Sequence, residues 1–205
     1  MRCAPPARQR TPPRLFVAAT LAPGGTVDLA PAQAHYVVNV MRRGEGDSLL
    51  LFNGRDGEWR AEIGAVRRGR DLAAAVVERT RRQAPEPDVW LMFAAVKRAP
   101  MNLIARGATE LGASALWPVL TRRTAVARVN LVRLGANARE AAEQCRRLTV
   151  PECFAPAPLE TALAACRHRR LLVCDGSGDG APIARALSAE AALRSAPLPT
   201  VAVWG

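Results

Sequence analysis

Cationic side chains follow two apolar runs in the middle of the chain. Lys97 comes directly after the run Val89 to Val96, and the tetrad Thr121-Arg122-Arg123-Thr124 comes after the run Ala115 to Leu120. If both runs are parallel strands, these residues stand at the carboxyl ends where an α/β sheet binds its ligands, and their chemistry suits a phosphate. The alternative is that strand ends are surface loops in any protein, so position alone leaves both interpretations open.

A second set of polar residues falls on one face of an expected helix from about Leu131 to Leu148. The set follows three- and four-residue steps, which place side chains on the same side of a helix. A solvated helix face would look similar. Asn137 and Gln144 are not needed for solubility, however, and an amide can read a base edge, so we favour a functional face. Its members are Arg133, Asn137, Glu140, Gln144 and Arg147.

The charge of the chain favours a polyanionic partner. Its 205 residues include 29 lysine and arginine residues against 18 aspartate and glutamate residues, a formal net charge of +11. Nucleic acid is the leading candidate for such a partner. Lys97 is the only lysine, so the other cations are all arginine, a uniformity that is typical of coding bias. A basic but merely solvated surface is therefore the competing interpretation.

The cysteines indicate a reducing cytoplasm. There are five, an odd number, and no two have the two-residue gap of a metal knuckle or redox motif, so neither a disulfide framework nor a zinc site is expected. The loop from Asp175 to Gly180 fails as a calcium loop, because its twelfth position is Ala186 and not glutamate. No apolar run approaches the roughly 18 residues of a membrane span, so no membrane partner is expected.

The chain is expected to divide into two domains. Residues 1–13 are a basic, proline-rich tail, and residues 14–82 contain closely spaced short strands, with a hairpin turn at Asn53-Gly54, that suggest a small barrel. Residues 83–88 contain two prolines and read as a linker. From 89 to 205, strands alternate with helices, which predicts a parallel α/β domain. The barrel segments are expected at 32–43 (helix), 47–52, 58–66 and 72–77 (strands).

The second domain is expected to contain strands at 89–96, 115–120, 171–174 and 200–204, and helices at 102–111, 131–148, 159–166 and 181–193. Several of the pieces described above together resemble the ribosomal small-subunit methyltransferase E family. The resemblance runs from about Arg14 to Gly205. It is carried by Arg14-Leu15-Phe16-Val17, His35 to Arg42 with Gly46-Asp47, Lys97, Thr109 to Gly112, Pro118, Thr121 to Thr124, Asn130, Arg133, and Glu140 to Arg147 ending at Pro151.

This resemblance implies an N-terminal PUA-like RNA-binding barrel joined to a SPOUT-type α/β domain with a trefoil knot. The implied enzyme is a homodimer that transfers a methyl group from S-adenosylmethionine to N3 of one uridine in 16S ribosomal RNA, within the small ribosomal subunit. Because arginine stays protonated, it can stabilise the uracil anion but is a poor base. The expected catalytic residues are Arg14 and Arg123, the RNA-binding residues are Arg42, Arg43, Lys97, Arg122, Arg133, Asn137, Gln144 and Arg147, and the cofactor-binding residues are Val173, Cys174, Asp175 and Gly205.

The resemblance also has a departure. Members of the family continue their last strand into a Gly-Pro-Glu-Gly-Gly cofactor loop and a further helical segment, whereas this sequence stops at Gly205, the first of those glycines. We therefore expect a C-terminally truncated domain with an incomplete knot that binds S-adenosylmethionine weakly or not at all. The alternative function is that of a non-catalytic RNA-binding fragment of the same family.

Overall fold

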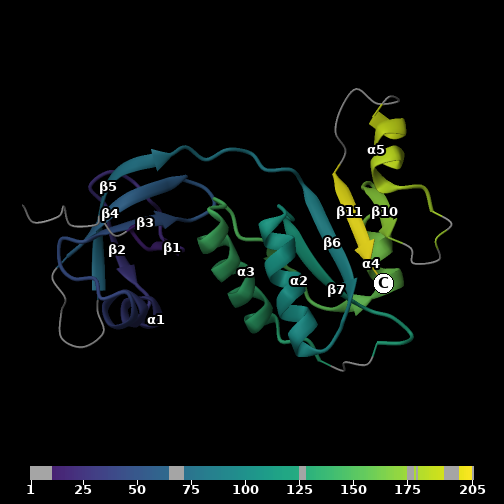
Figure 1. Ribbon diagram of the computed structural model, residues 1–205, viewed down its shortest axis with the longest axis horizontal. Helices are drawn as coiled ribbons and strands as arrows, with labels where there is room; N and C mark the ends of the chain where they lie inside the picture. Colours follow the sequence, from purple (N-terminus) through teal and green to yellow (C-terminus); the bar gives the residue numbers. More distant parts are fainter. Residues whose placement is uncertain are drawn as a thin grey trace, which may run out of the picture. The chain divides into compact units, whose positions relative to one another are not determined.

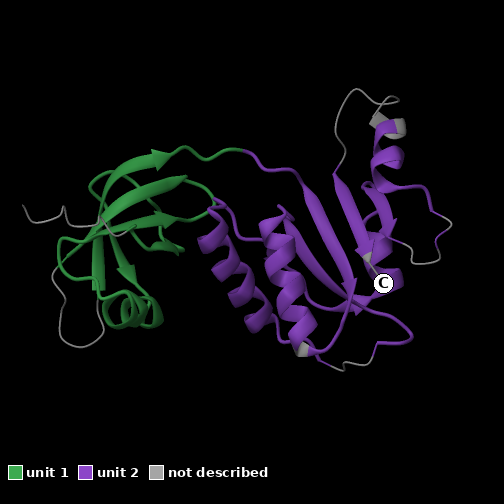
Figure 2. Cartoon of the chain, viewed as in Figure 1, with its two compact units in different colours: residues 1–84 green, residues 85–205 purple. Residues whose placement is uncertain are grey.

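The computed structural model describes residues 11–64, 72–124, 128–174, 178, 180–191 and 199–204. The chain forms two compact units, residues 1–84 and residues 85–205 (Figure 2). The boundary between them lies inside segment 83–88, which the sequence analysis interprets as a linker. Expected site residues Asp175 and Gly205 lie outside the described residues.

The first unit is a five-stranded curled sheet (Figure 1). Strand β1 pairs with β3 in parallel, while β3, β4, β5 and β2 are successive antiparallel neighbours. Alternate side chains of β3 and β4, such as Leu49, Leu51, Ala61 and Ile63, are buried in a shared core, as expected for a sheet with one face packed and the other exposed to solvent. The strands are β1 (Arg14–Phe16), β2 (Thr26–Leu29), β3 (Ser48–Phe52), β4 (Glu58–Ile63) and β5 (Leu72–Arg81).

The helix expected at 32–43 is shorter and less regular than its apolar spacing suggests. It consists of α1 (Pro31–His35) followed by a single π-helical segment, η1 (Tyr36–Val40). Arg42, with a φ of 53°, ends the segment in a left-handed conformation. The structure also adds β2, which the sequence analysis did not predict, because the segment is only four residues long with two prolines nearby.

The loop between β3 and β4 confirms the hairpin turn expected at Asn53-Gly54. The Asn53 Oδ1 atom accepts the backbone N–H groups of Arg55 and Asp56 at 3.0 and 2.9 Å. The backbone N–H of Leu21, and then the Asn53 amide, lower the pKa of Asp56 by donating to its carboxylate. Gly57 closes the loop at a φ of 87°, where an added Cβ would clash with the backbone carbonyl of Arg81.

The second unit is built on a parallel sheet, with strands in the order β10-β11-β6-β7-β8 and β9 also pairing with β7. All the recorded pairings in this sheet are parallel, which confirms the α/β architecture expected from the alternation of strands and helices. The strands are β6 (Val89–Ala94), β7 (Ala115–Leu120), β8 (Glu152–Cys153), β9 (Ala157–Pro158), β10 (Arg170–Cys174) and β11 (Thr200–Trp204).

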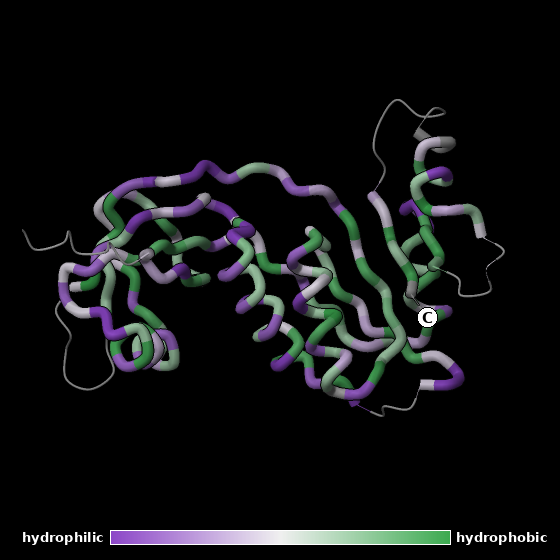
Figure 3. The backbone as a smooth tube through the Cα atoms, in the orientation of Figure 1, coloured by the Kyte–Doolittle hydropathy of each residue, from purple (hydrophilic) through white to green (hydrophobic). Residues whose placement is uncertain are grey.

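Helices cover both faces of this sheet. On one face, α2 (Arg98–Glu110) and α3 (Leu131–Cys145) pack on Phe93 and Leu116. On the other, α4 (Leu159–Ala165) packs on Met92 and Val119. Successive residues of a strand point to opposite faces, so the apolar run of β6 serves two separate cores. Figure 3 shows hydrophobic and hydrophilic residues alternating along α2 and α3. A further helix, α5, spans Ile183–Ala191.

Two helix boundaries of the second unit differ from the expected ones by three residues or more. Helix α2 begins at Arg98, four residues before the expected start, because a proline is tolerated in a first helical turn and Pro100 lies there. Helix α3 ends at Cys145 and not at Leu148, because Arg146 adopts the left-handed conformation with a φ of 63°. This cap turns the following residue, Arg147, off the helix.

Candidate functional site

The carboxyl ends of four strands lie in register at one edge of the parallel sheet. Cys174 of β10 pairs with Trp204 of β11, Trp204 with Phe93 of β6, and Phe93 with Pro118 of β7. The segments that follow β10, β6 and β7 therefore leave from the same edge. This is the edge at which open α/β sheets bind ligands, and the strand-end residues Lys97, Arg122, Arg123 and Cys174 follow or end these strands.

A pocket of about 440 Å³ lies where β6 leads into α2 and where α3 begins. Its polar lining combines the cations Lys97, Arg128 and Arg133 with the amides of Asn102 and Asn130. Its apolar lining consists of Val96, Met101, Val129 and Leu134. The pocket therefore offers positive charge, hydrogen-bonding amides and an apolar surface to one small ligand.

Asn102 connects the polar groups of this pocket. Its Oδ1 atom accepts hydrogen bonds from Arg133 Nε at 3.2 Å and from Asn137 Nδ2 at 2.8 Å. Asn130 caps α3, with its Oδ1 atom accepting the backbone N–H of Arg133 at 2.9 Å. The helical periodicity of the sequence places Arg133 and Asn137 on one helix face, and the structure brings them together at Asn102.

Asn102 is a residue that the sequence analysis missed. It lies on α2, whereas Arg133 and Asn137 lie on α3, and a single sequence does not show that the two helices pack together. One signal was available, because asparagine is a poor residue for a helix interior and the chain contains only five of them.

Arg122 and Arg123 occupy a tight turn directly after β7. Thr124 Oγ1 accepts the backbone N–H of Thr121 at 2.7 Å, and the Thr124 N–H donates to the Thr121 carbonyl at 3.0 Å. The threonines thus satisfy the polar groups of the turn, and both arginines between them are exposed. Gln144, on α3, is also exposed, and its amide donates to Glu140 Oε1 at a long 3.4 Å.

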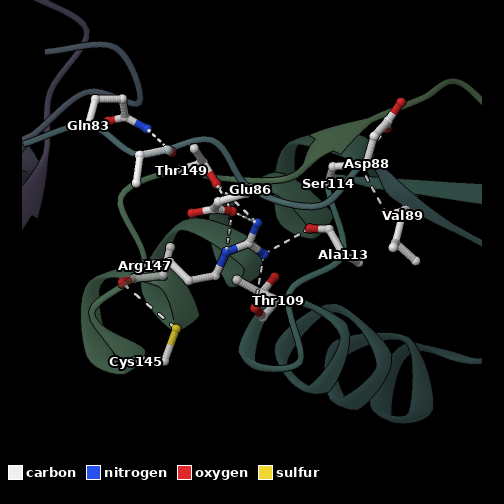
Figure 4. Close-up of polar contacts among 12 residues, drawn as sticks. Gln83, Glu86, Asp88, Val89, Thr109, Ala113, Ser114, Cys145, Arg147 and Thr149 are labelled. Carbon is white, nitrogen blue, oxygen red and sulfur yellow. Dashed lines mark hydrogen bonds and ion pairs between the residues drawn. The ribbon is translucent and has the colours of Figure 1, made fainter. Parts of the chain in front are cut away.

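Arg147 does not share a helix face with Arg133, contrary to the expected pattern, because α3 ends two residues earlier. Its guanidinium lies inside the second unit, with its side chain 10% exposed, and reaches back toward the start of that unit (Figure 4). The periodicity of the sequence was misleading here, since it contains no glycine to mark the left-handed cap.

The contacts of Arg147 use every N–H donor of its guanidinium. Nη1 donates to the carbonyl oxygens of Thr109 and Ala113 at 3.0 and 2.8 Å. Nη2 donates to Thr149 Oγ1 at 3.0 Å and to Glu86 Oε2, and Nε donates to the same Glu86 oxygen at 3.1 Å. This is the pattern of a structural clamp that ties Glu86 to the end of α2.

Arg14 lies in a buried ion pair of the first unit. Its Nε atom is 2.5 Å from Glu58 Oε2, and both side chains are 7% exposed. The guanidinium stacks over the Phe52 ring at 3.7 Å from its centroid. Glu58 also accepts a hydrogen bond from Thr80 Oγ1 at 3.1 Å and lies 3.8 Å from Arg81 Nη1. Arg14 thus has packing and charge partners of its own within the sheet.

The two arginines after η1 differ in exposure. Arg42 is exposed. Arg43 has a side chain that is 10% exposed, and its Nη2 atom donates to the Thr11 carbonyl at 2.8 Å while Nη1 lies 4.0 Å from Asp47. Of this pair, Arg42 is the one whose charge faces water.

The expected cofactor residues that the structure describes lie at the carboxyl end of β10, the outermost strand on one side of the sheet. Val173 is 64% exposed although apolar, and Cys174 is an exposed free thiol. Both belong to β10, and Cys174 is its last residue. Neither side chain is committed to a core, so both are available to a ligand at the carboxyl edge.

Among the described residues, no group of three histidine, cysteine, aspartate or glutamate side chains could hold a metal ion. Within the same ranges, no helix has the length and apolar character needed to span a membrane.

Comparison with known proteins identifies the class. A family model described as an RNA methyltransferase domain matches residues 83–195, which is more than half of the chain. A second, described as an RNA methyltransferase PUA domain, matches residues 29–70. The chain belongs to this RNA methyltransferase family, in which the ribosomal RNA small subunit methyltransferase E proteins are found.

Several curated relatives carry that name. The protein from Rickettsia conorii is 33% identical over 139 residues, covering 67% of this chain and 57% of the relative. The protein from Synechocystis is 36% identical over 146 residues, covering 70% of this chain and 47% of the relative. The chain thus spans about half the length of the curated relatives it matches.

Solved structures share the fold. A ribosomal RNA small subunit methyltransferase E from Neisseria gonorrhoeae, bound to S-adenosylmethionine, aligns with a TM-score of 0.78 at 20% identity, covering 94% of this chain and 78% of its own. A Legionella pneumophila methyltransferase in complex with the same cofactor aligns with a TM-score of 0.79 at 22% identity, covering 95% and 79%. At these identities the likeness concerns the fold alone.

Proposed function

We propose that this chain forms part of an enzyme that transfers the methyl group of S-adenosylmethionine to N3 of one uridine in 16S ribosomal RNA of the small subunit. The observation that carries the proposal is the alignment of four strand ends at one edge, where cations and the exposed end of β10 occur together. Family membership supplies the reaction class. A SPOUT-type knot, a homodimer and a cytoplasmic location belong to the same proposal.

The cofactor is proposed to bind at the carboxyl ends of β10 and β11, near Val173, Cys174, Asp175 and Gly205. The described residues fit this role, because Val173 exposes apolar surface and Cys174 a soft sulfur at a strand end. S-adenosylmethionine would supply an electrophilic methyl group on a sulfonium cation. Because that centre is positive, its site requires no phosphate-binding loop, and the cations at the same edge are free to bind RNA.

The acceptor nitrogen determines what the protein side chains must do. N3 of uracil is a weakly acidic imide, so its proton must leave and the resulting anion must be stabilised. We propose that Arg123 stabilises this anion, since an arginine remains charged and cannot act as the base. Arg122, Lys97, Arg133, Asn137, Gln144 and Arg42 are proposed to hold the RNA. Arg14, Arg43 and Arg147 contribute less directly, because their guanidinium groups already have protein partners.

The test is methylation by the protein of small ribosomal subunits that lack the modification. We expect one methyl group at N3 of a single uridine. Arg123→Ala is expected to lower the rate by about 100-fold, as for loss of one preorganised charge-stabilising donor. Arg106→Ala, an exposed arginine of α2 outside the pocket lining, serves as the matched control and should leave the rate unchanged. Full activity of Arg123→Ala would remove that residue from the mechanism, and RNA binding without methyl transfer would favour the non-catalytic alternative.

Thiol labelling tests the proposed position of the cofactor. Cys174 is exposed, whereas burial raises the pKa of Cys153 to about 11 and also raises the pKa of Cys166. Since the thiolate is the reactive form, about one in a thousand Cys153 thiols is ionised near pH 8, and iodoacetamide should label Cys174 much faster. S-adenosylhomocysteine is expected to slow labelling of Cys174 and leave Cys145 unaffected, as measured by peptide mass spectrometry. Equal labelling of Cys174 at saturating ligand would place the cofactor elsewhere.

A further inference from the structure

We propose that the pocket between the starts of α2 and α3 holds a single nucleotide of unpaired RNA, and that Asn102 is the residue that positions Arg133 for its phosphate. The inference rests on the proposed function in one respect, namely that the ligand is RNA. It adds a defined subsite to that function: one phosphate on Lys97, Arg128 and Arg133, and one base against the apolar lining.

The amino-acid composition of the chain supports a binding function for this pocket. Lys97 is the single lysine among 29 cationic residues, and it lines this pocket. The chain has five asparagines, and three of them, Asn102, Asn130 and Asn137, lie in the pocket or bond to its lining. A coding bias that converts lysine to arginine and leaves few amides does not explain why the one lysine and three of the five asparagines occur at this pocket. A need for a compact ammonium and for oriented amides at one place explains both.

The hydrogen bonds at Asn102 orient Arg133. Two donors, Arg133 Nε and Asn137 Nδ2, converge on the single Asn102 Oδ1 atom, which fixes the direction of the carbonyl. Arg133 therefore uses its Nε to hold its plane, and within the described ranges this is the one side-chain hydrogen bond recorded for it. Its Nη1 and Nη2 groups remain for a ligand, in the fork geometry that matches two phosphate oxygens.

The shape and lining of the pocket favour one unpaired nucleotide. About 440 Å³ lies in the lower part of the range of small-molecule pockets, roughly 300–1,000 Å³, which suits a nucleotide and excludes a duplex. Val96 and Val129 are partly exposed and present apolar surface in the pocket, and the buried side chains of Met101 and Leu134 also line it. A base can contact such a surface only after leaving its stack, as bases do in the single-stranded regions where proteins read RNA.

The experiment uses the protein without S-adenosylmethionine and three probes: uridine 5′-monophosphate, uridine and inorganic phosphate. In a spectrum of side-chain amides, the monophosphate should shift the signals of Asn102 and Asn137, and leave Asn53 of the first unit unmoved. It should bind about tenfold more tightly than either uridine or phosphate alone, because base and phosphate each contribute. Movement of other signals with Asn102 and Asn137 unmoved would overturn the proposal.

Three variants separate positioning from folding. Asn102→Ala is expected to lower the affinity for the monophosphate by about tenfold and the affinity for uridine much less, because Asn102 acts through the contact between Arg133 and the phosphate. Lys97 is exposed, so Lys97→Ala should leave the core intact. It should reduce the slope of the logarithm of the RNA-binding constant against the logarithm of the salt concentration by about one, as measured with unpaired RNA. Arg106→Ala, also on α2, should change neither quantity.

The outcomes also distinguish this subsite from the enzyme itself. Unchanged monophosphate affinity in both Asn102→Ala and Lys97→Ala would remove the subsite even if methylation proceeded normally. Monophosphate binding at Asn102 without any methyl transfer to small subunits would keep the subsite and contradict the proposed activity.

Discussion

Replacing Arg14 with alanine is expected to lower the free energy of unfolding of the first unit by about 3 kcal/mol, because the change removes the nearest cation of the buried Glu58 carboxylate and leaves it with the Thr80 hydroxyl and the more distant Arg81. It also removes the stacking of the guanidinium on Phe52. Arg81 cannot replace it, since its Nη1 atom lies 3.8 Å from the carboxylate and its side chain is 46% exposed. Native-state hydrogen exchange of β3 and β4 amides, resolved by peptide, measures the loss.

A double substitution tests the cause. Arg14→Met combined with Glu58→Leu should recover most of the lost stability, because apolar residues can replace a buried ion pair at little net cost. Arg60→Ala is the matched control on the same sheet: its pairs with Glu62 and Glu78 face water, so its removal should have a much smaller effect. If Arg14→Ala folds with unchanged protection yet loses methylation, the arginine acts in catalysis, as its sequence motif suggested.

Arg147→Ala is expected to destabilise the second unit by about 3 kcal/mol. The substitution removes the five N–H donors of Arg147 at once. It leaves the Ala113 carbonyl without its hydrogen bond, the Thr109 carbonyl with only the Gly112 N–H, and the Glu86 carboxylate without its cation and with the Thr149 hydroxyl as its remaining donor. The loss is limited because the Glu86 side chain is 24% exposed, so water reaches the carboxylate when the arginine is gone. Hydrogen exchange of peptides covering the end of α2 and the start of β6 measures the effect.

Two further variants define what the clamp requires. Arg147→Lys should recover less than half of the loss, because an ammonium cannot reach four separate acceptors with three donors. Arg106→Ala should be far milder, since that arginine is 64% exposed and pairs with Glu110 on the surface of the same helix. Normal exchange protection together with weakened RNA binding in Arg147→Ala would instead assign the residue to the RNA-binding set.

The sequence predicts the elements of the second unit well and their ends less well. Strand β7 occupies the expected residues, Ala115–Leu120, because a short apolar run ahead of a charged turn has few other interpretations. The end of α3 was misplaced because a left-handed cap is normally a glycine, and here Arg146 adopts it. The two-residue strands β8 and β9 are too short to leave a periodic pattern.

The site was predictable where it depends on strand ends and helix faces. Lys97, Arg133 and Asn137 could be selected in this way, since parallel strands and helical periodicity are local rules. The roles of Arg14 and Arg147 could not, because each depends on a carboxylate far along the chain: Glu58 is 44 residues from Arg14, and Glu86 is 61 residues from Arg147. In a chain where arginine is the commonest cation, residue type alone does not separate a buried clamp from an exposed RNA contact.

The position of β11 imposes an order on assembly during synthesis. In the described part of the chain, β10 pairs with β11 and with no other strand, and β11 lies between β10 and β6 although it is the last of these strands to be made. The pair β6 and β7 can form once residue 120 has been translated. Strand β10 has no partner strand until residues 200–204 have been translated and β11 can insert between β10 and β6. The nascent chain therefore carries the backbone N–H and C=O groups of β10 without a strand partner through that interval, a period in which a chaperone would have a substrate.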